Sequence, residues 1–351
     1  MEEGINKSIG NRCRNISNNK LNRFNNILLQ DSTHLKLHRN LEECYPGNEN
    51  NFKEIKKAGM KIHTIYNLSK EKFDSFELSS FRKNDQKASP DILGVAGKDD
   101  LIIRDLGYFV IDTLKEITGR GIYYITRYHR GAFVLNKENQ SRIDLVKLIK
   151  KQRFVDIDVL LGVESKFPCR LVAIPMTNQA AATKRRKAKN NRDRRLKPDS
   201  DAIFLMGWMI YITNLDRKEF SSKEIFVYYR LRWRIETLFK SWKSCFRITD
   251  IEELSNKIMV DNFIYQMLLF ITLFQISYSK FSETNRISQG NNRPLSIIKY
   301  AEFVNNNLLF IIASAIRKTT PVLLEEFVNY YCNYESRNKR NNFSQSLNLL
   351  G

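Results

Sequence analysis

The stretch of sequence that decides the fold is Tyr229-Arg-Leu-Arg-Trp-Arg-Ile-Glu-Thr-Leu-Phe-Lys-Ser-Trp-Lys243. It predicts a helix, which we expect to run from about residue 222 to residue 245. Ser221 and Glu224 have the spacing of a capping box, in which two side chains satisfy free backbone N–H groups at a helix start. The sequence therefore predicts both the helix and the point where it begins.

One face of this helix is polar, and four residues share it: Tyr229, Arg232, Glu236 and Lys243. Their separations of 3, 4 and 7 residues place them within roughly 60° of one another, since each helical residue advances by about 100°. Four apolar residues gather on the opposite side, where they can pack against a core: Leu231, Ile235, Leu238 and Trp242. A carboxylate among cations on a polar face also fits ordinary salt bridging between helical turns.

Two aspartates on predicted strands add to this pattern. Asp31 lies in an apolar and then alternating run that begins at Ile27, which is typical of a strand. Asp105 ends the short run Leu101-Ile-Ile-Arg-Asp105, as expected at the carboxyl end of a buried strand. Together with Glu236 they supply the oxygen ligands of a site for two Mg²⁺ ions about 4 Å apart. Neighbouring Arg, Lys and Tyr side chains would grip substrate phosphates.

The spacing Tyr229-x2-Arg232-x3-Glu236-x6-Lys243 matches the Y-R-E-K signature of IS4-type insertion-sequence transposases, and the chain resembles this family. Residues 231–240, which end at Lys240, resemble the RWxIExxFK core of the family. The residues around Asp31 (Gln-Asp-Ser-Thr) and Asp105 (Arg-Asp-Leu-Gly-Tyr-Phe) resemble those of the first two DDE acids. The resemblance covers roughly residues 25–280.

The resemblance implies an α/β fold, namely an RNase H-like mixed sheet flanked by helices, with a β-rich insertion before the catalytic-Glu helix. The distribution of apolar and polar stretches along the chain agrees with that layout. We expect five segments: a short, poorly structured N-terminal segment (1–24), the first part of the core (25–131), the β-rich insertion with a basic arm (132–213), the rest of the core with the signature helix (214–280), and a helical C-terminal region with a frayed tail (281–351).

The resemblance also implies a reaction, which is DNA transposition by cut and paste. Three acids would hold two Mg²⁺ ions, with Mn²⁺ as a substitute: Asp31, Asp105 and Glu236. Water would nick the DNA at the element end, and the freed 3′-OH would form a hairpin and, after hairpin opening, attack target DNA. The end phosphates would be positioned by the other signature residues: Tyr229, Arg232 and Lys243. A homodimer would form the synaptic complex.

Three further side chains are candidates for DNA contact. Trp208 lies 21 residues before Tyr229, where relatives carry a tryptophan that stacks on a base flipped from the transposon end. Such stacking is worth about 1–3 kcal/mol, although Trp208 also fits the core of a strand. Arg127 and Arg130 follow a predicted core strand, but exposed loop arginines are common.

The charge balance points to a polyanionic partner. The chain has 58 Lys+Arg against 38 Asp+Glu, a net charge of +20, which fits a DNA-binding protein and also a ribosome-associated or membrane-surface protein. The segment Lys184–Lys197 holds nine basic residues and one acidic residue. It fits either a DNA-tracking arm or a solvated loop.

Composition disfavours secretion and membrane insertion. The first 30 residues contain no apolar signal core, and the apolar stretch 263–278 is shorter than the ~20 residues of a membrane span. We therefore expect this stretch to be a buried core helix, within a helical region over 251–278, and we expect no membrane partner. Five scattered cysteines without a CxxC pair indicate a reducing compartment. We expect a bacterial cytoplasmic protein associated with the nucleoid.

One departure from the family leaves alternatives open. Only 30 residues precede Asp31, whereas relatives usually carry a helical region there that recognises the terminal inverted repeats. We therefore expect an N-terminally truncated copy, end recognition elsewhere, or an internal start codon. The alternative functions are a catalytically incompetent DNA-binding remnant and an RNase H-like host nuclease.

Overall fold

A computed structural model describes these residues: 21–47, 57–152, 154–190, 197–288, 295–309, 311, 328 and 331–332. The chain divides into two compact units. The Asp31 unit comprises Met1–Val95 and Arg230–Gly351, and the Asp105 unit comprises Ala96–Tyr229. The expected tail after Ser336 lies outside the described residues, as does the expected N-terminal segment up to residue 20. Leu21–Arg23 form a turn of 3₁₀ helix, η2.

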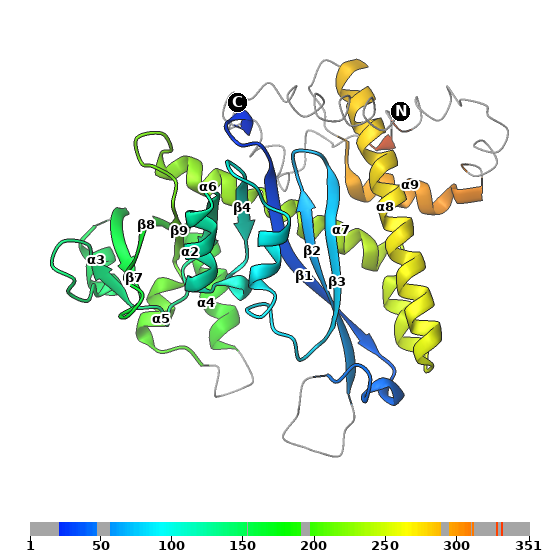
Figure 1. The fold of residues 1–351 in the computed structure, drawn as a ribbon, viewed down its shortest axis with the longest axis horizontal. Coiled ribbons are helices and arrows are strands. Elements are labelled where there is room, and N and C mark those ends of the chain that lie inside the picture. Colours follow the sequence, from blue (N-terminus) through cyan, green and yellow to red (C-terminus); the bar gives the residue numbers. More distant parts are fainter. Residues whose placement is uncertain are drawn as a thin grey trace. The chain divides into compact units, whose positions relative to one another are not determined.

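Three antiparallel strands lie side by side in the Asp31 unit (Figure 1): β1 (Ile27–Leu37), β2 (Ala58–Asn67) and β3 (Lys72–Ser80). Short 3₁₀ turns follow β1 and β3, namely η3 (Arg39–Leu41) and η4 (Ser89–Gly94). The predicted strand through Asp31 is confirmed by β1. Residues 33–37 alternate between buried and exposed, because successive side chains of a strand point to opposite faces. Residues 27–30 are all buried, so both faces of the sheet are covered there.

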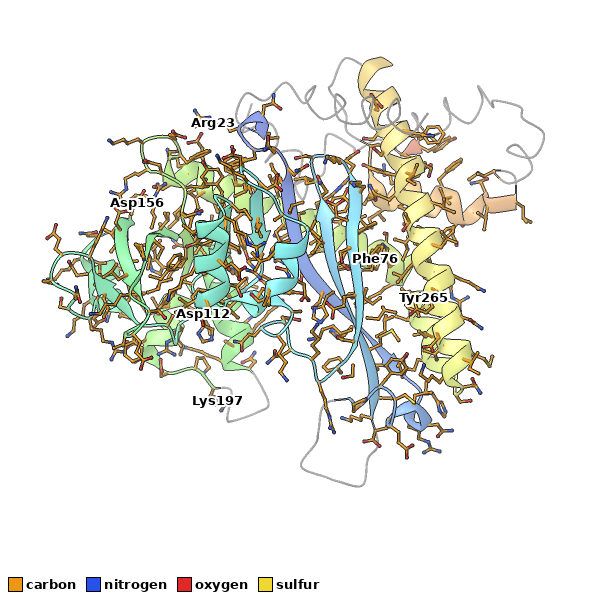
Figure 2. All side chains as sticks on the ribbon, viewed as in Figure 1. Arg23, Phe76, Asp112, Asp156, Lys197 and Tyr265 are labelled. Atoms are coloured by element: carbon orange, nitrogen blue, oxygen red, sulfur yellow. The ribbon has the colours of Figure 1, made fainter. Side chains whose placement is uncertain are left out.

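Helices flank this sheet, in chain order: α7 (Trp233–Ser244), the 3₁₀ segment η7 (Ile248–Glu253), α8 (Lys257–Ser288) and α9 (Ile297–Asn306). The predicted apolar face of the signature helix is confirmed in α7. Its Trp242 is fully buried, and the indole ring lies 5.6 Å from the ring of Phe73 and 6.1 Å from that of Phe76, both on β3. Figure 2 marks Phe76. Ile235 and Leu238 are also buried.

The helix α8 differs from the expected core helix over 251–278. It begins later, because residues 248–253 form the 3₁₀ segment, and it runs on to Ser288. Among the described residues it is the one helix long and apolar enough, by length and composition, to cross a membrane: an 18-residue window within Lys257–Glu283 has a mean hydropathy of 1.4, and 33% of that window is buried. The expected buried core helix is therefore only partly buried, with one side packed and the other exposed. One side of α8 packs on the sheet, where Gln275 Nε2 donates to Tyr66 Oη at 3.1 Å and to the Glu71 carbonyl at 2.8 Å.

The Asp105 unit contains a mixed sheet with strand order β4-β5-β9-β8-β7-β6. The parallel pair is β4 (Leu101–Arg104) and β5 (Tyr123–Arg127), joined by η5 (Leu106–Tyr108) and α2 (Ile111–Gly119). Antiparallel strands continue the sheet: β9 (Trp208–Thr213), β8 (Phe167–Pro175), β7 (Val155–Leu161) and β6 (Val134–Asn136). The remaining helices are α3 (Leu145–Lys151), α4 (Asn178–Lys189), α5 (Ser200–Leu205) and α6 (Ser222–Arg230). The predicted fold class is confirmed as α/β, a mixed sheet flanked by helices.

A buried ion pair joins strands β7 and β8 to the start of α6. Arg170 on β8 is 3% exposed and donates to both carboxylate oxygens of Asp156 on β7, at 2.8 and 2.7 Å. Its Nη1 also donates to the Phe220 carbonyl at 2.7 Å. Burial alone would raise the pKa of Asp156, but hydrogen bonds from Arg170 and from Ser222, the first residue of α6, outweigh it, so the pKa lies below its ordinary value.

Replacing this acid tests how strongly the network holds the Asp105 unit together. We expect Asp156→Asn to lower the free energy of unfolding by about 3 kcal/mol, because it leaves the Arg170 charge buried without its partner. Urea unfolding followed by circular dichroism measures the change. The control is Asp158→Asn on the same strand, since Asp158 is half exposed and contacts the exposed Arg217 at 3.1 Å. Equal destabilisation by both changes would contradict a stabilising role of the buried Asp156–Arg170 pair.

Candidate active site

The signature segment is not the continuous helix that was predicted. The helix α6 ends at Arg230 and α7 begins at Trp233. In the turn between them the backbone forms tighter hydrogen bonds between residues three apart, from Arg234 N to Leu231 O at 3.0 Å and from Ile235 N to Arg232 O at 3.2 Å. Tyr229 consequently belongs to the Asp105 unit, and the other signature residues belong to the Asp31 unit. The prediction that all four line one helical stripe was wrong.

Within the Asp31 unit, two of the predicted acids converge on one arginine. Arg232 Nη1 donates to Asp31 Oδ2 at 2.8 Å, and Arg232 Nη2 bonds to Glu236 Oε1. The arginine is 9% exposed and lies at the N-terminal cap of α7, with Glu236 one turn further on. The other oxygen of Asp31 accepts from the backbone N–H of Ser32 at 2.8 Å. Strand β1 and helix α7 therefore present both carboxylates to a single cationic group.

Within the Asp105 unit, the third acid lies beside the first signature residue. Asp105 directly follows β4, as predicted, and its Oδ1 accepts from Tyr229 Oη at 3.4 Å. The Tyr229 ring lies 4.7 Å from that of Tyr211 on β9, and the Arg127 guanidinium lies over it, 5.9 Å from the ring centroid. These contacts fix the direction in which the phenol points at the aspartate.

The remaining candidates have distinct surroundings. Lys243 is half-buried on α7, and burial lowers its pKa. Lys240 on the same helix is exposed. Trp208 is the first residue of β9, is half-buried, and lies 6.4 Å from the ring of Phe204. Arg130 donates to both oxygens of Asp199 at 2.8 and 2.7 Å, and this aspartate caps α5.

The basic segment contains a residue that sequence reasoning did not single out. Residues 184–189 lie in α4 and not in a loop, and residues 191–196 lie outside the described residues. Lys184 is half-buried, although its neighbours Arg186 and Lys187 are exposed. The sequence could have indicated this burial, because Lys184 follows the buried Ala181 by three residues, and this spacing places both on one face of the helix.

The family model for the Transposase DDE domain matches residues 22–257. The chain belongs to this family. The matched region contains all three predicted acids and the whole signature, and the resemblance to IS4-type insertion-sequence transposases is confirmed.

Curated relatives of this DDE chain include transposases of insertion sequences. The chain is 27% identical over 325 residues to the transposase of IS231E from Bacillus thuringiensis subsp. finitimus, covering 87% of this chain and 66% of the relative. It is 23% identical over 269 residues to the transposase of IS1151 from Clostridium perfringens, covering 70% of this chain and 56% of the relative. The chain thus spans about two thirds of the length of its IS231 relative. A solved structure of the piggyBac transposase synaptic complex with hairpin DNA matches with a TM-score of 0.43 and 12% identity, over 90% of this chain and 59% of that one.

The acids of the DDE domain fit a hard divalent cation. All three are carboxylates, which provide the oxygen ligands preferred by Mg²⁺ and Mn²⁺. In the Asp31 unit two of them already converge on a cation, the Arg232 guanidinium. No group of three or more His, Cys, Asp or Glu side chains within the described residues is placed to hold a metal ion. The acids come from both units.

A change at Arg232 tests whether the two acids form a cation site. We expect Arg232→Gln to lower the free energy of unfolding by about 3 kcal/mol, because two carboxylates then face each other without their shared cation. Millimolar Mg²⁺ should raise the Tm of this variant more than that of the wild type. The control is Arg234→Gln, which removes another buried arginine of α7, one that contacts Glu71 at 3.3 Å. An equal Mg²⁺ response in all three proteins would contradict a cation site here.

Proposed function

We propose that this chain cleaves DNA at the ends of an insertion sequence and transfers the strands to target DNA, by cut and paste through a hairpin. The observation that carries the proposal is the complete Tyr229-Arg232-Glu236-Lys243 signature within the matched DDE domain, with Arg232 joined to Asp31 and Glu236. The net charge of +20 supports a DNA substrate.

Each protein group has a role in this reaction. Asp31, Asp105 and Glu236 would hold two Mg²⁺ ions, with Mn²⁺ as a substitute. When bound, the ions supply activation of the attacking oxygen and stabilisation of the leaving oxygen. In each transfer a P–O bond to the attacking 3′ oxygen forms as the old P–O bond breaks. The attacking hydroxyl gives its proton to solvent, and the leaving oxygen takes up a proton to become a free hydroxyl. No covalent bond forms between protein and DNA.

The other signature residues position the phosphates. Tyr229 holds Asp105 through its hydroxyl group, and Arg127 over its ring presents a guanidinium to the DNA. On α7, Lys243 would contact an end phosphate, and the exposed Lys240 would add a second, weaker contact. Arg232 orients two of the acids through its planar fork.

Two further candidates are supported unequally. The half-buried indole of Trp208 at the start of β9 leaves part of the ring available to stack on a flipped base. Arg130 has less capacity to bind DNA, because both oxygens of Asp199 already occupy its guanidinium.

The reaction is tested with purified protein, Mg²⁺ and a duplex from the element end. We expect nicks and hairpins with the wild type and a loss of both, by about 1,000-fold or more, in Asp105→Asn, because the acid loses its charge. DNA affinity should stay within about threefold, since phosphate contacts dominate binding. Asp112→Asn on α2, marked in Figure 2, is the control, because its carboxylate is 87% exposed. Binding without metal-dependent cleavage would assign a DNA-binding remnant, and cleavage of arbitrary DNA without joining would assign a nuclease.

We further propose that the protein acts as a homodimer in the bacterial cytoplasm, on nucleoid DNA and away from membranes. The apolar side of α8 supports a second copy as its partner. Five large side chains fall within about 80° on this helix and are 47–68% exposed: Ile258, Tyr265, Leu269, Leu273 and Ile276. They offer on the order of 600 Å² per chain, close to the ~800 Å² per partner of a standard interface.

Charge placed on this helix face tests the dimer. We expect the wild type to be dimeric at micromolar concentration and Leu269→Lys/Leu273→Lys to be monomeric with an unchanged Tm, as measured by light scattering after gel filtration. Leu309→Lys is the control, because this leucine is 83% exposed outside α8. A monomeric wild type would contradict the dimer. Binding of the wild type to lipid vesicles that the double change abolishes would assign the face to a membrane.

A further inference from the structure

The residues on either side of Asp31 in β1 have their side chains on the opposite face of the sheet. Successive side chains of a strand alternate in direction, so Gln30 and Ser32 point away from the face that carries Asp31. The Asp31 face is the one that α7 covers, because Asp31 lies in register, across β2, with Phe76, whose ring is 6.1 Å from that of Trp242. The other face of β1, β2 and β3 is called the rear face below.

Both neighbours of Asp31 are bound on the rear face to one short segment that follows β3. Ser32 Oγ donates to Asp85 Oδ1 at 3.0 Å, and Gln30 Nε2 donates to the Ala88 carbonyl at 3.0 Å. Gln30 is buried and Ser32 is half-buried, and hydrogen bonds are stronger where water is largely excluded. The segment therefore holds the strand on both sides of the candidate metal ligand.

Asp85 is itself held in place by a cation of the neighbouring strand. Lys61 Nζ on β2 donates to the same Asp85 oxygen at 3.1 Å, and His63 Nδ1 lies 3.9 Å from that oxygen. The Asp85 and Lys61 side chains are partly buried, and the Lys61 ammonium lies 5.6 Å from the centroid of the Phe81 ring. Hydrogen bonds between charged groups are stronger than those between neutral groups. The carboxylate of Asp85 therefore has a defined position behind β1 and β2.

The serine that Asp85 binds also donates to the candidate metal ligand. The backbone N–H of Ser32 donates to Asp31 Oδ1 at 2.8 Å, while Arg232 Nη1 donates to Asp31 Oδ2 at 2.8 Å. A shift of the peptide group between Asp31 and Ser32 would therefore turn this carboxylate relative to Glu236. Groups that hydrogen-bond to a metal ligand orient it, and their loss commonly costs about 10–100-fold in metal affinity or activity.

We propose that Asp85 is a positioning residue for Asp31, acting through Ser32 from the rear face of the sheet. The proposal rests on the proposed function, in which Asp31 holds a divalent cation, and it adds a residue outside the signature and outside the three acids. Asp85 fixes the Ser32 side chain, and the Ser32 backbone fixes Asp31 Oδ1. The cation would then meet a carboxylate that is already oriented, so fewer groups have to be ordered on binding.

The experiment measures Mn²⁺ binding to the full chain without DNA, from the electron paramagnetic resonance signal of free Mn²⁺. We expect Ser32→Ala and Asp85→Asn each to raise the Kd for Mn²⁺ about tenfold, because the backbone donor to Asp31 loses its support. Ser32→Thr should bind Mn²⁺ like the wild type, because threonine keeps the hydroxyl group.

The matched control is Glu77→Gln, which also changes an acid of the rear face to its amide. Glu77 lies in register with Ser32 across β2, but its carboxylate pairs with Lys83. This change should alter the Kd for Mn²⁺ by less than about twofold, because Glu77 contacts neither neighbour of Asp31 through a hydrogen bond of its carboxylate to Ser32 or Gln30.

Stability separates a positioning role from a purely structural one. Asp85→Asn and Glu77→Gln each remove one partly exposed ion pair and should lower the Tm by similar small amounts. A lower Tm of Ser32→Ala and Asp85→Asn with unchanged Mn²⁺ binding would overturn the proposal. Equal effects of Asp85→Asn and Glu77→Gln on the Kd would also overturn it, as would a wild type that does not bind Mn²⁺. Because the assay contains no DNA, a wild type whose Mn²⁺ binding depends on Asp85 but that does not cleave would contradict only the proposed function.

Discussion

The Arg232 guanidinium is the group on which the Asp31 unit depends. It joins Asp31 on the first strand to Glu236 on α7, residues separated by 205 positions in the sequence. The Arg232 and Asp31 side chains are only 11% and 15% exposed, so they are stable together only when their hydrogen bonds are made. Arg232 also lies at the cap of α7, so Glu236 falls in the first turn, where the helix dipole favours a negative charge. The same contact therefore orients the acid in the first turn of α7.

In the Asp105 unit the candidate acid is contacted by an aromatic side chain, whereas in the Asp31 unit the two acids are contacted by a cation. The Tyr229 ring contacts both Tyr211 and Arg127, and its hydroxyl donates to Asp105. The four-residue signature thus crosses the boundary between the two units, with its tyrosine in one and its remaining residues in the other. The regular spacing of the signature reflects two short helices joined by a tight turn, each orienting its own acid.

Much of this arrangement could be predicted from local pattern. The alternation of residues 33–37 predicted β1, and the apolar run before Asp105 predicted β4. The apolar positions of α7, including Trp242, also follow from helical spacing. In each case one buried face determines the local structure, and a period of two or of 3.6 residues reveals that face.

The rest depends on contacts that sequence spacing does not show. A helical wheel places Arg232 on a polar surface, whereas its burial against a distant strand ends one helix and begins the next. In α8 large apolar residues occur on both sides of the helix, so periodicity cannot tell the side that packs on the sheet from the side that stays exposed. Charge counting treats the basic segment as uniform and does not separate Lys184 from its exposed neighbours.

The central proposal is that Asp31, Asp105 and Glu236 serve one metal-dependent site. Iron-mediated cleavage of the polypeptide tests it most directly, because Fe²⁺ with ascorbate and peroxide generates radicals that cut the backbone next to the bound ion. The account predicts fragments from cuts near all three acids, each suppressed by excess Mg²⁺. Cuts near Asp31 and Glu236 without any near Asp105, or cuts that Mg²⁺ leaves unchanged, would contradict it.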